Sequence, residues 1–324
     1  MIIYQPPKAA TSIPVIDFAP ALSGDPAARR AVAWEIHKAC RETGFFYIVG
    51  HGVPEALMQG QLDAARDFFA LPLEQKLDLH MNKSPARRGY EPIAAQTLDE
   101  GAPPDLKESL MLGREPIDAD DLAHGAAPNP WPENLAGFRE QNQAYEAAVT
   151  ALGRTLAATL ALSLELPEDY FADGLERANV TVRLLRYPPQ AENAEFNQLG
   201  SGAHTDWGML TILLQDDIGG LEVRNVQGDW IRADPKPGAF IINLGDMIPA
   251  VTAGLYTSNF HRVLNNASGR DRYSVATFFN PSQLYEFDVA PSCRAPDHQP
   301  QVQTFGDHIN RMFEKTYASA AQGR

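Results

Sequence analysis

The chain has 324 residues, of which 44% are hydrophobic and 21% are charged, and its formal net charge at pH 7 is −14. This composition is sufficient for a sizeable core and excludes a disordered chain. An acidic surface repels phosphate backbones and anionic membranes, so we expect neither nucleic acid nor a membrane surface as a partner. The two cysteines, Cys40 and Cys293, are too few for a disulfide framework or a cysteine-based zinc site.

The same composition points to a reducing compartment. No apolar run reaches the roughly 20 residues that cross a bilayer, and the N-terminal residues contain no long apolar segment. We therefore expect a cytoplasmic protein. The sequence does not predict its oligomeric state.

The first elements in chain order are short strands and helices. Residues 13–18 (IPVIDF) predict a strand, and a helix follows with Asp25 as N-cap, Pro26 in its first turn and Gly44 at its end. A second strand is predicted within residues 44–54, and a second helix follows it.

The middle of the chain predicts a loop and then a helix. Residues 81–130 are rich in Pro, Gly, Asn and Asp and have little periodicity, so we expect mostly loop there. A long amphipathic helix is predicted from an apolar stripe with helical spacing at Tyr145, Val149, Leu152, Leu156 and Leu160.

After about residue 178 the pattern changes to short apolar segments separated by turn residues. This pattern is typical of an antiparallel sandwich or barrel. A last helix is predicted to begin at Thr304, where TFGD resembles a capping box, and to end near Tyr317.

One of these segments begins with two potential metal ligands, His204 and Asp206. Side chains alternate along a strand, so residues two positions apart point to the same face. His261 follows 55 residues after Asp206, a separation that allows a return strand to bring it back beside the pair. Further on, Arg272 and Ser274 share one strand face, and a guanidinium beside a hydroxyl can bind a carboxylate.

The ordered set His204-Thr-Asp206, His261 and Arg272-Tyr-Ser274 resembles the isopenicillin N synthase-like family of Fe(II)/2-oxoglutarate-dependent oxygenases. The resemblance extends over much of the chain through these further segments: IPVIDF, GFFYIVGHGVP, RRGYEP, DLKESLMLG, LLRYPP, HTDWGMLTILLQD, GGLEV, GAFIINLGDM and SNFHRV. It implies a mixed α/β (α+β) fold with a double-stranded β-helix (jelly-roll) core braced by helices. The implied parts are an N-terminal region 1–130, a bracing helix 131–177, the core 178–290 and a C-terminal helix 291–324, in one catalytic unit.

The resemblance implies that His204, Asp206 and His261 bind Fe(II). Independently, two histidines and one carboxylate form a facial triad that leaves coordination positions open, whereas a closed four-ligand zinc site does not. The family likeness also implies that Arg272, Ser274 and Tyr187 bind 2-oxoglutarate. Arg272 is preferred over the neighbouring Arg270 because only Arg272 has a serine two places on.

The implied activity is oxidation, in the first place hydroxylation, of a small-molecule substrate with O2 and 2-oxoglutarate, with ascorbate as a reductant. Strand alternation and family position predict substrate contacts from these residues: Phe278, Asn280, Arg183 and Trp207. The sequence departs from the commoner pattern at Trp207, next to the metal-ligand aspartate, and at Leu185, where plant members carry asparagine.

Three alternatives remain open from the residues alone. The first is an iron oxidase of the same fold that does not use 2-oxoglutarate, as in isopenicillin N synthase itself. The second is a metal- or ligand-binding β-barrel without turnover. The third, a zinc hydrolase, is disfavoured because no general base stands at a recognisable offset from the triad.

Overall fold

A computed structural model describes residues 10–99, 102–190 and 198–322. Its centre is an eight-stranded sheet in the order β1-β2-β10-β7-β12-β5-β4-β3. The strands of this sheet are β1 (Val15–Asp17), β2 (Phe45–Val49), β3 (Gly89–Glu91), β4 (Glu108–Gly113), β5 (Asn179–Tyr187), β7 (Leu210–Gln215), β10 (Phe240–Leu244) and β12 (Arg272–Asn280). All its pairings are antiparallel except that of β1 with β2.

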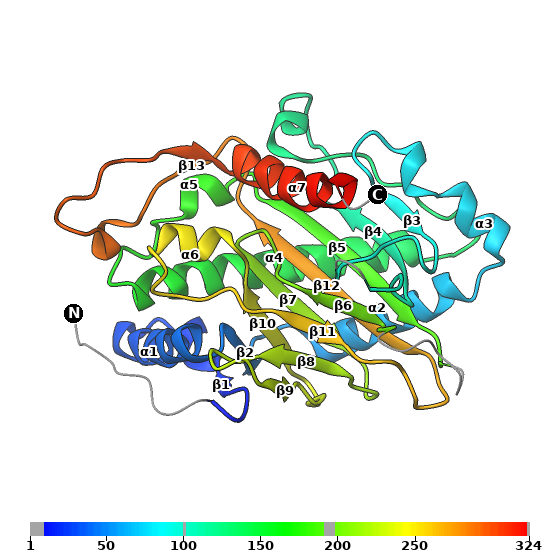
Figure 1. The fold of residues 1–324 in the computed structure, drawn as a ribbon, viewed down its shortest axis with the longest axis horizontal. Coiled ribbons are helices and arrows are strands. Elements are labelled where there is room, and N and C mark those ends of the chain that lie inside the picture. The colour runs from blue at the N-terminus through cyan, green and yellow to red at the C-terminus, as the bar shows by residue number, and fades with distance from the viewer. Residues whose placement is uncertain (1–9, 100–101, 191–197, 323–324) are drawn as a thin grey trace.

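A smaller sheet faces the large one. It has the order β6-β11-β8-β9, with β6 (Ser201–His204), β8 (Leu221–Arg224), β9 (Trp230–Arg232) and β11 (His261–Val263). A third pairing joins β13 (Glu286–Phe287) to β14 (Gln303–Thr304). Figure 1 shows the small sheet on one side of the large sheet and the long helix α4 (Phe138–Ser163) on the other. This arrangement confirms the predicted jelly-roll core braced by helices.

Helices cover the outer face of the large sheet. The helix α4 packs against β5, β7 and β12, and also against α1 (Pro26–Glu42) and α2 (Glu55–Phe69). The remaining helices are α3 (Leu73–Asp78), α5 (Ala172–Leu175), α6 (Met247–Val251) and α7 (Phe305–Gln322). Close approach of α4 to the sheet depends on Gly153, because a Cβ at this position would lie 2.6 Å from the Phe279 ring.

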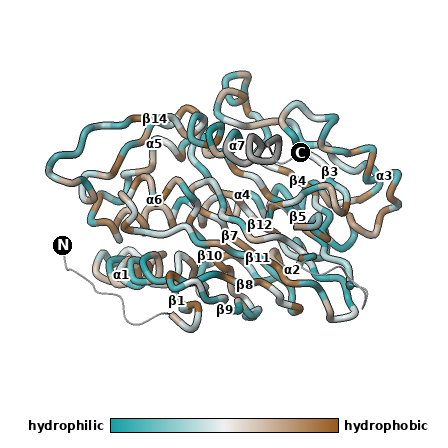
Figure 2. The backbone as a smooth tube through the Cα atoms, in the orientation of Figure 1, coloured by the Kyte–Doolittle hydropathy of each residue, from teal (hydrophilic) through white to brown (hydrophobic). Residues whose placement is uncertain are grey.

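Alternation along the large strands separates two apolar clusters. On β5 and β12, one set of side chains, including Val182, Leu184 and Val275, belongs to the core beneath the helices. The other set, including Leu185 and Ala276, belongs to a second cluster between the two sheets. The hydrophobic segments follow the strands and helices, while the peripheral loops are largely hydrophilic (Figure 2). Because the second cluster lies between the two sheets, polar side chains on this inter-sheet face point into the space between the sheets.

Most predicted elements are confirmed. The Asp25 side chain accepts a hydrogen bond from Ala27 N at the start of α1, and Thr304 Oγ1 accepts one from Asp307 N at the start of α7. The expectation of mostly loop over residues 81–130 is wrong for β3 and β4. The strand β4 was not recognised because nearly all of its residues are buried, so it has no alternating polar pattern.

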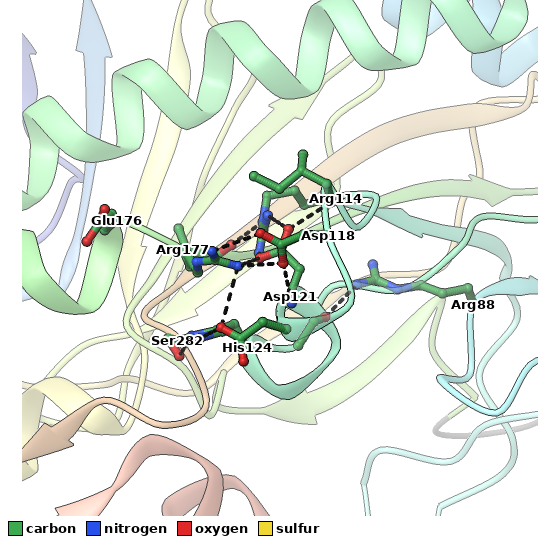
Figure 3. Close-up of polar contacts among 12 residues, drawn as sticks. Arg88, Arg114, Asp118, Asp121, His124, Glu176, Arg177 and Ser282 are labelled. Carbon is green, nitrogen blue, oxygen red and sulfur yellow. Dashed lines mark hydrogen bonds and ion pairs between the residues drawn. The ribbon is translucent and has the colours of Figure 1, made fainter.

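An ion-pair network fastens the segment after β4 to the sheet. Arg114 donates two hydrogen bonds to Asp121, at 2.7 and 2.8 Å, and Arg177 binds both Asp118 and Asp121. Figure 3 shows these four side chains pointing toward one another, with His124 held nearby by Ser282. The hydrogen bonds from Arg114 keep the pKa of Asp121 well below its usual range.

The sequence expected no membrane partner. None of the helices in the described ranges has both the length and the apolar character needed to span a bilayer.

Candidate metal centre

Three potential ligands meet at the edge of the small sheet. His204 ends β6 and His261 begins β11, and the two residues are paired across these antiparallel strands. Asp206 Oδ1 lies 4.0 Å from His204 Nε2 and 3.9 Å from His261 Nε2. The three ligand atoms all lie within 4.8 Å of one another, and this is the one such cluster of His, Cys, Asp and Glu among the residues that the structure describes.

Neighbouring groups orient each ligand atom. His204 Nδ1 lies 2.8 Å from the carbonyl oxygen of Gly202, and His261 Nδ1 lies 3.4 Å from that of Asn259. A carbonyl can only accept, so each Nδ1 carries the proton and each Nε2 keeps its lone pair for a metal.

The carboxylate is held by two donors on its far oxygen. Asp206 Oδ2 accepts hydrogen bonds from Thr211 Oγ1 at 2.6 Å and from Asn243 Nδ2 at 2.7 Å. Oδ1 is left facing the two imidazoles. With neutral imidazoles, the three residues present two nitrogen lone pairs and one anionic oxygen, a donor set that fits a ferrous ion with open coordination positions.

Burial and neighbouring groups shift the pKa values of His204 and Asp206. Desolvation, followed by the nearby His261, lowers the pKa of His204 to about 3, so its imidazole is neutral at pH 7. Burial opposes the charge of Asp206, but the adjacent imidazoles and two hydrogen bonds outweigh it and lower the pKa of this carboxyl. Both residues are therefore in the protonation state that a metal requires.

A cavity lies between the two sheets beside these ligands. It is lined by Phe45, Leu98, Lys107, Arg183, Leu185, Tyr187, Ser201, His204, Asp206, Thr211, Leu213, Leu221, Asn243, His261, Val263, Arg272, Ser274, Ala276 and Phe278.

The predicted carboxylate-binding pair lies in this lining. Arg272 is only 1% exposed, yet it forms no ion pair with any residue in the described ranges. Its guanidinium donates to Ser274 Oγ at 3.3 Å and to Gln215 Oε1 at 3.2 Å, and its Nε has no partner among the described residues. A buried cation without a counter-ion is costly, so this site is suited to an anionic ligand.

The pairing of β12 with β5 determines which residues lie around Arg272. Arg272 is paired with Tyr187 of β5, and the guanidinium carbon lies 4.7 Å from the centre of the tyrosine ring. Arg270, by contrast, is largely exposed and pairs with Asp217 at 3.0 Å. The structure therefore brings Arg272, Ser274 and Tyr187 into the cavity and leaves Arg270 at the surface.

The four predicted substrate residues divide into two groups. Phe278 and Arg183 line the cavity, whereas Asn280 and Trp207 are absent from its described lining. Asn280 Oδ1 accepts a hydrogen bond from Met209 N at 2.8 Å, and the carbonyl oxygen of Trp207 is bound by His308 Nε2 at 2.8 Å. Asn280 thus braces the turn after the metal ligands, and Trp207 connects that turn to α7.

Sequence reasoning missed several polar residues in the cavity, including Lys107, Ser201, Thr211 and Asn243. Lys107 comes two residues before Ser109, which pairs with Leu185 of β5, so both share the inter-sheet face. The i, i+2 spacing of Lys107 and Ser109 was the available signal, but this segment lies in the region expected to be mostly loop.

Two family models and a curated relative each match a large part of the chain. The model of the family described as non-haem dioxygenase in morphine synthesis N-terminal matches residues 13–134. The model of the 2OG-Fe(II) oxygenase superfamily matches residues 178–281. A 2-oxoglutarate-Fe(II) type oxidoreductase of Emericella nidulans is 37% identical over 325 residues, which cover 96% of this chain and 92% of the relative.

Two solved structures are similar to this chain over most of its length. A full-length Neurospora crassa protein, in complex with alpha-KG and thymine, has a TM-score of 0.83 and 26% identity, covering 95% of this chain and 97% of that one. JOX2, in complex with 2OG, Fe and JA, has a TM-score of 0.78 and 30% identity, covering 94% and 85% of the two chains.

Proposed function

The chain belongs to the 2OG-Fe(II) oxygenase superfamily, and on this premise we propose that His204, Asp206 and His261 hold its iron, while Arg272 and Ser274 hold its 2-oxoglutarate. The protein is a 2-oxoglutarate-dependent dioxygenase, an oxidoreductase that uses Fe(II) as cofactor. The proposal therefore concerns the roles of individual residues and the kind of substrate.

The observation that carries this assignment is the buried Arg272 beside a His–Asp–His cluster. A guanidinium that is 1% exposed and forms no ion pair with the described residues is suited to a carboxylate from outside the chain. The hydroxyl of Ser274 and the ring of Tyr187 lie against this guanidinium, so a carboxylate bound there would meet a preformed site.

When bound, iron supplies O2 activation coupled to conversion of 2-oxoglutarate to succinate and CO2, with oxidation of a second substrate. The protein residues orient the reactants around it. Thr211 and Asn243 hold Asp206 Oδ2, and the carbonyl of Gly202 holds His204, which keeps the ligand atoms directed inward.

The substrate is proposed to be a small molecule, which is hydroxylated between the metal and the walls carrying Phe278 and Arg183. Both side chains line the same cavity as the metal ligands, which supports contact with a substrate there. Asn280 and Trp207 are left out of this proposal, because neither belongs to the described lining of this cavity. The JOX2 structure contains 2OG, Fe and the small molecule JA together.

A cytoplasmic location is part of the same proposal. It is supported by the low cysteine content and by the free thiols of Cys40 and Cys293.

The direct test is decarboxylation of 2-oxoglutarate. Protein supplied with Fe(II), ascorbate, O2 and 2-oxoglutarate should form succinate slowly by itself and faster with a productive substrate. The His261→Ala variant should abolish both rates. Equal succinate formation by the variant and the native protein would contradict the metal assignment, and oxidation of a substrate without succinate would favour an oxidase that does not use 2-oxoglutarate.

A further inference from the structure

Two further cations line the cavity besides Arg272, namely Lys107 and Arg183. Arg183 and Leu185 share one face of β5, and Leu185 is paired with Ser109, the residue two positions after Lys107. Both cations therefore project from the large sheet toward the cavity, but from β5 and the start of β4, whereas Arg272 lies on β12. The 2-oxoglutarate site accounts for neither of them.

Hydrogen bonds to the described residues leave part of the donor capacity of each cation unused. Lys107 Nζ donates to Asp105 and, at 3.2 Å, to Ser201 Oγ, so one of its three N–H groups has no partner among the described residues. Arg183 donates from Nε to Ser109 at 3.0 Å and from Nη2 to Glu91 and Gln96. Its Nη1 has no hydrogen bond to a described residue, which leaves two more donors.

The carboxylate partners of these cations lie behind them. Asp105 and Glu91 are not part of the described cavity lining, whereas Lys107 and Arg183 are. Asp105 is also turned away toward the backbone, where its Oδ1 accepts from Gly202 N at 2.9 Å. Among the described residues, the cavity lining therefore contains three cationic side chains and one carboxylate, that of Asp206, although the chain as a whole carries a net charge of −14.

A purely structural lysine in this protein has different surroundings. Lys76 forms a similarly buried pair with Glu108, at 2.8 Å. It also donates to the carbonyl oxygen of Phe69 and lies 5.3 Å from the centre of the Tyr90 ring, outside the described cavity lining. Lys76 therefore provides an internal comparison for a buried lysine with no access to a ligand.

We propose that Lys107 and Arg183 together bind a carboxylate of the substrate, so that the substrate class is a small carboxylic acid. This inference rests on the proposed function, because it assigns Arg272 to 2-oxoglutarate and leaves the other two cations for the second substrate. Leu98, Leu185 and Phe278 line the same cavity and would contact the apolar body of such an acid. Lys107 is thereby a specificity-determining residue.

A competing explanation is that Lys107 only positions a metal ligand. Asp105 connects Lys107 to Gly202, whose carbonyl oxygen binds His204 Nδ1. If this were the whole role of Lys107, its removal would weaken metal binding and would leave the preference for acids unchanged. The two explanations therefore predict opposite results for two measurable affinities.

The experiment uses calorimetric titration of full-length protein loaded with Fe(II) and 2-oxoglutarate under anaerobic conditions. The probes are benzoate, hexanoate and norleucine, each compared with its primary amide. At least one acid should bind at least about tenfold more tightly than its amide. Lys107→Met should weaken that acid by at least about 30-fold, as expected when one partner of a buried charge pair is removed. Affinities for the amides, Fe(II) and 2-oxoglutarate should change less than threefold.

Two further variants keep the result interpretable. Lys107→Met with Asp105→Asn removes both charges and should show the same loss of acid binding without an unpaired buried carboxylate. Lys76→Met should lower thermal stability and leave the acid preference intact.

Failure of 2-oxoglutarate to bind the native protein would contradict the proposed function, and this is measured before any probe is added. If that complex forms, acids that bind no better than amides, or an acid preference that survives both Lys107 variants, would overturn the inference.

Discussion

Replacing Arg272 by methionine should weaken 2-oxoglutarate binding strongly without lowering the stability of the ligand-free protein. Arg272 is 1% exposed and forms no ion pair with the described residues, so without 2-oxoglutarate none of their carboxylates is in direct contact with its guanidinium. Losing one partner of a buried, hydrogen-bonded charge pair typically costs about 3–5 kcal/mol, which corresponds to two to four decades in affinity. We therefore expect Arg272→Met to weaken 2-oxoglutarate binding by at least a hundredfold, and not to lower the stability of the ligand-free protein.

The assay is calorimetric titration of the Fe(II)-loaded protein with 2-oxoglutarate under anaerobic conditions, together with thermal unfolding in the presence and absence of the ligand. A ligand at a hundred times its Kd stabilises the native protein by about 2.7 kcal/mol, and this gain should disappear in the variant. Arg270→Ala is the matched control, because Arg270 is exposed and pairs with Asp217. The reasoning is refuted if Arg270→Ala weakens binding by orders of magnitude while Arg272→Met does not.

Three other predictions test the site and the fold. His204→Ala, Asp206→Ala and His261→Ala should each abolish Fe(II)-dependent turnover while circular dichroism stays native, and near-normal turnover in any one would remove that residue from the ligand set. Because Arg114 lowers the folded-state pKa of Asp121, this ion pair stabilises the folded protein above the unfolded pKa of about 3.9. That stabilisation is lost progressively as the pH falls from this value toward the lower folded-state pKa. Urea midpoints of native protein and Asp121→Asn should therefore differ at pH 7 and converge toward pH 3, and a constant difference would contradict this role. Gly153→Ala should cost about 1–3 kcal/mol in urea unfolding, because its Cβ would lie 2.6 Å from the Phe279 ring, and an unchanged midpoint would show that this ring can move.

Strand alternation predicted much of the candidate site. The alternation along β12 placed Arg272, Ser274 and Phe278 on one face, and all three line the cavity. The same rule included Asn280, the last residue of that strand, whose side chain instead binds Met209 N. Alternation identifies a face of the sheet, but it does not show how far along that face the cavity extends.

The residues that sequence reasoning missed depend on contacts between distant segments. Lys107 lies beside a strand whose position is fixed by pairing with β5, more than seventy residues further along the chain. Its segment has few polar–apolar alternations because β4 is buried on both faces. Similarly, β2 joins the large sheet by pairing with β10, which no local pattern near residue 45 could indicate. Local patterns predicted most of the elements but not β3 and β4, whereas these long-range pairings assemble the substrate side of the cavity.

The central claim is that one cavity holds iron on His204, Asp206 and His261 and 2-oxoglutarate on Arg272. The most direct measurement is the visible absorption of the anaerobic Fe(II) protein during titration with 2-oxoglutarate. Chelation of the metal by the 2-oxo acid should produce a weak metal-to-ligand charge-transfer band that saturates at one equivalent. The band should be absent in His261→Ala, and in Arg272→Met it should require at least a hundredfold more 2-oxoglutarate. Binding of both components without any such band would contradict the claim.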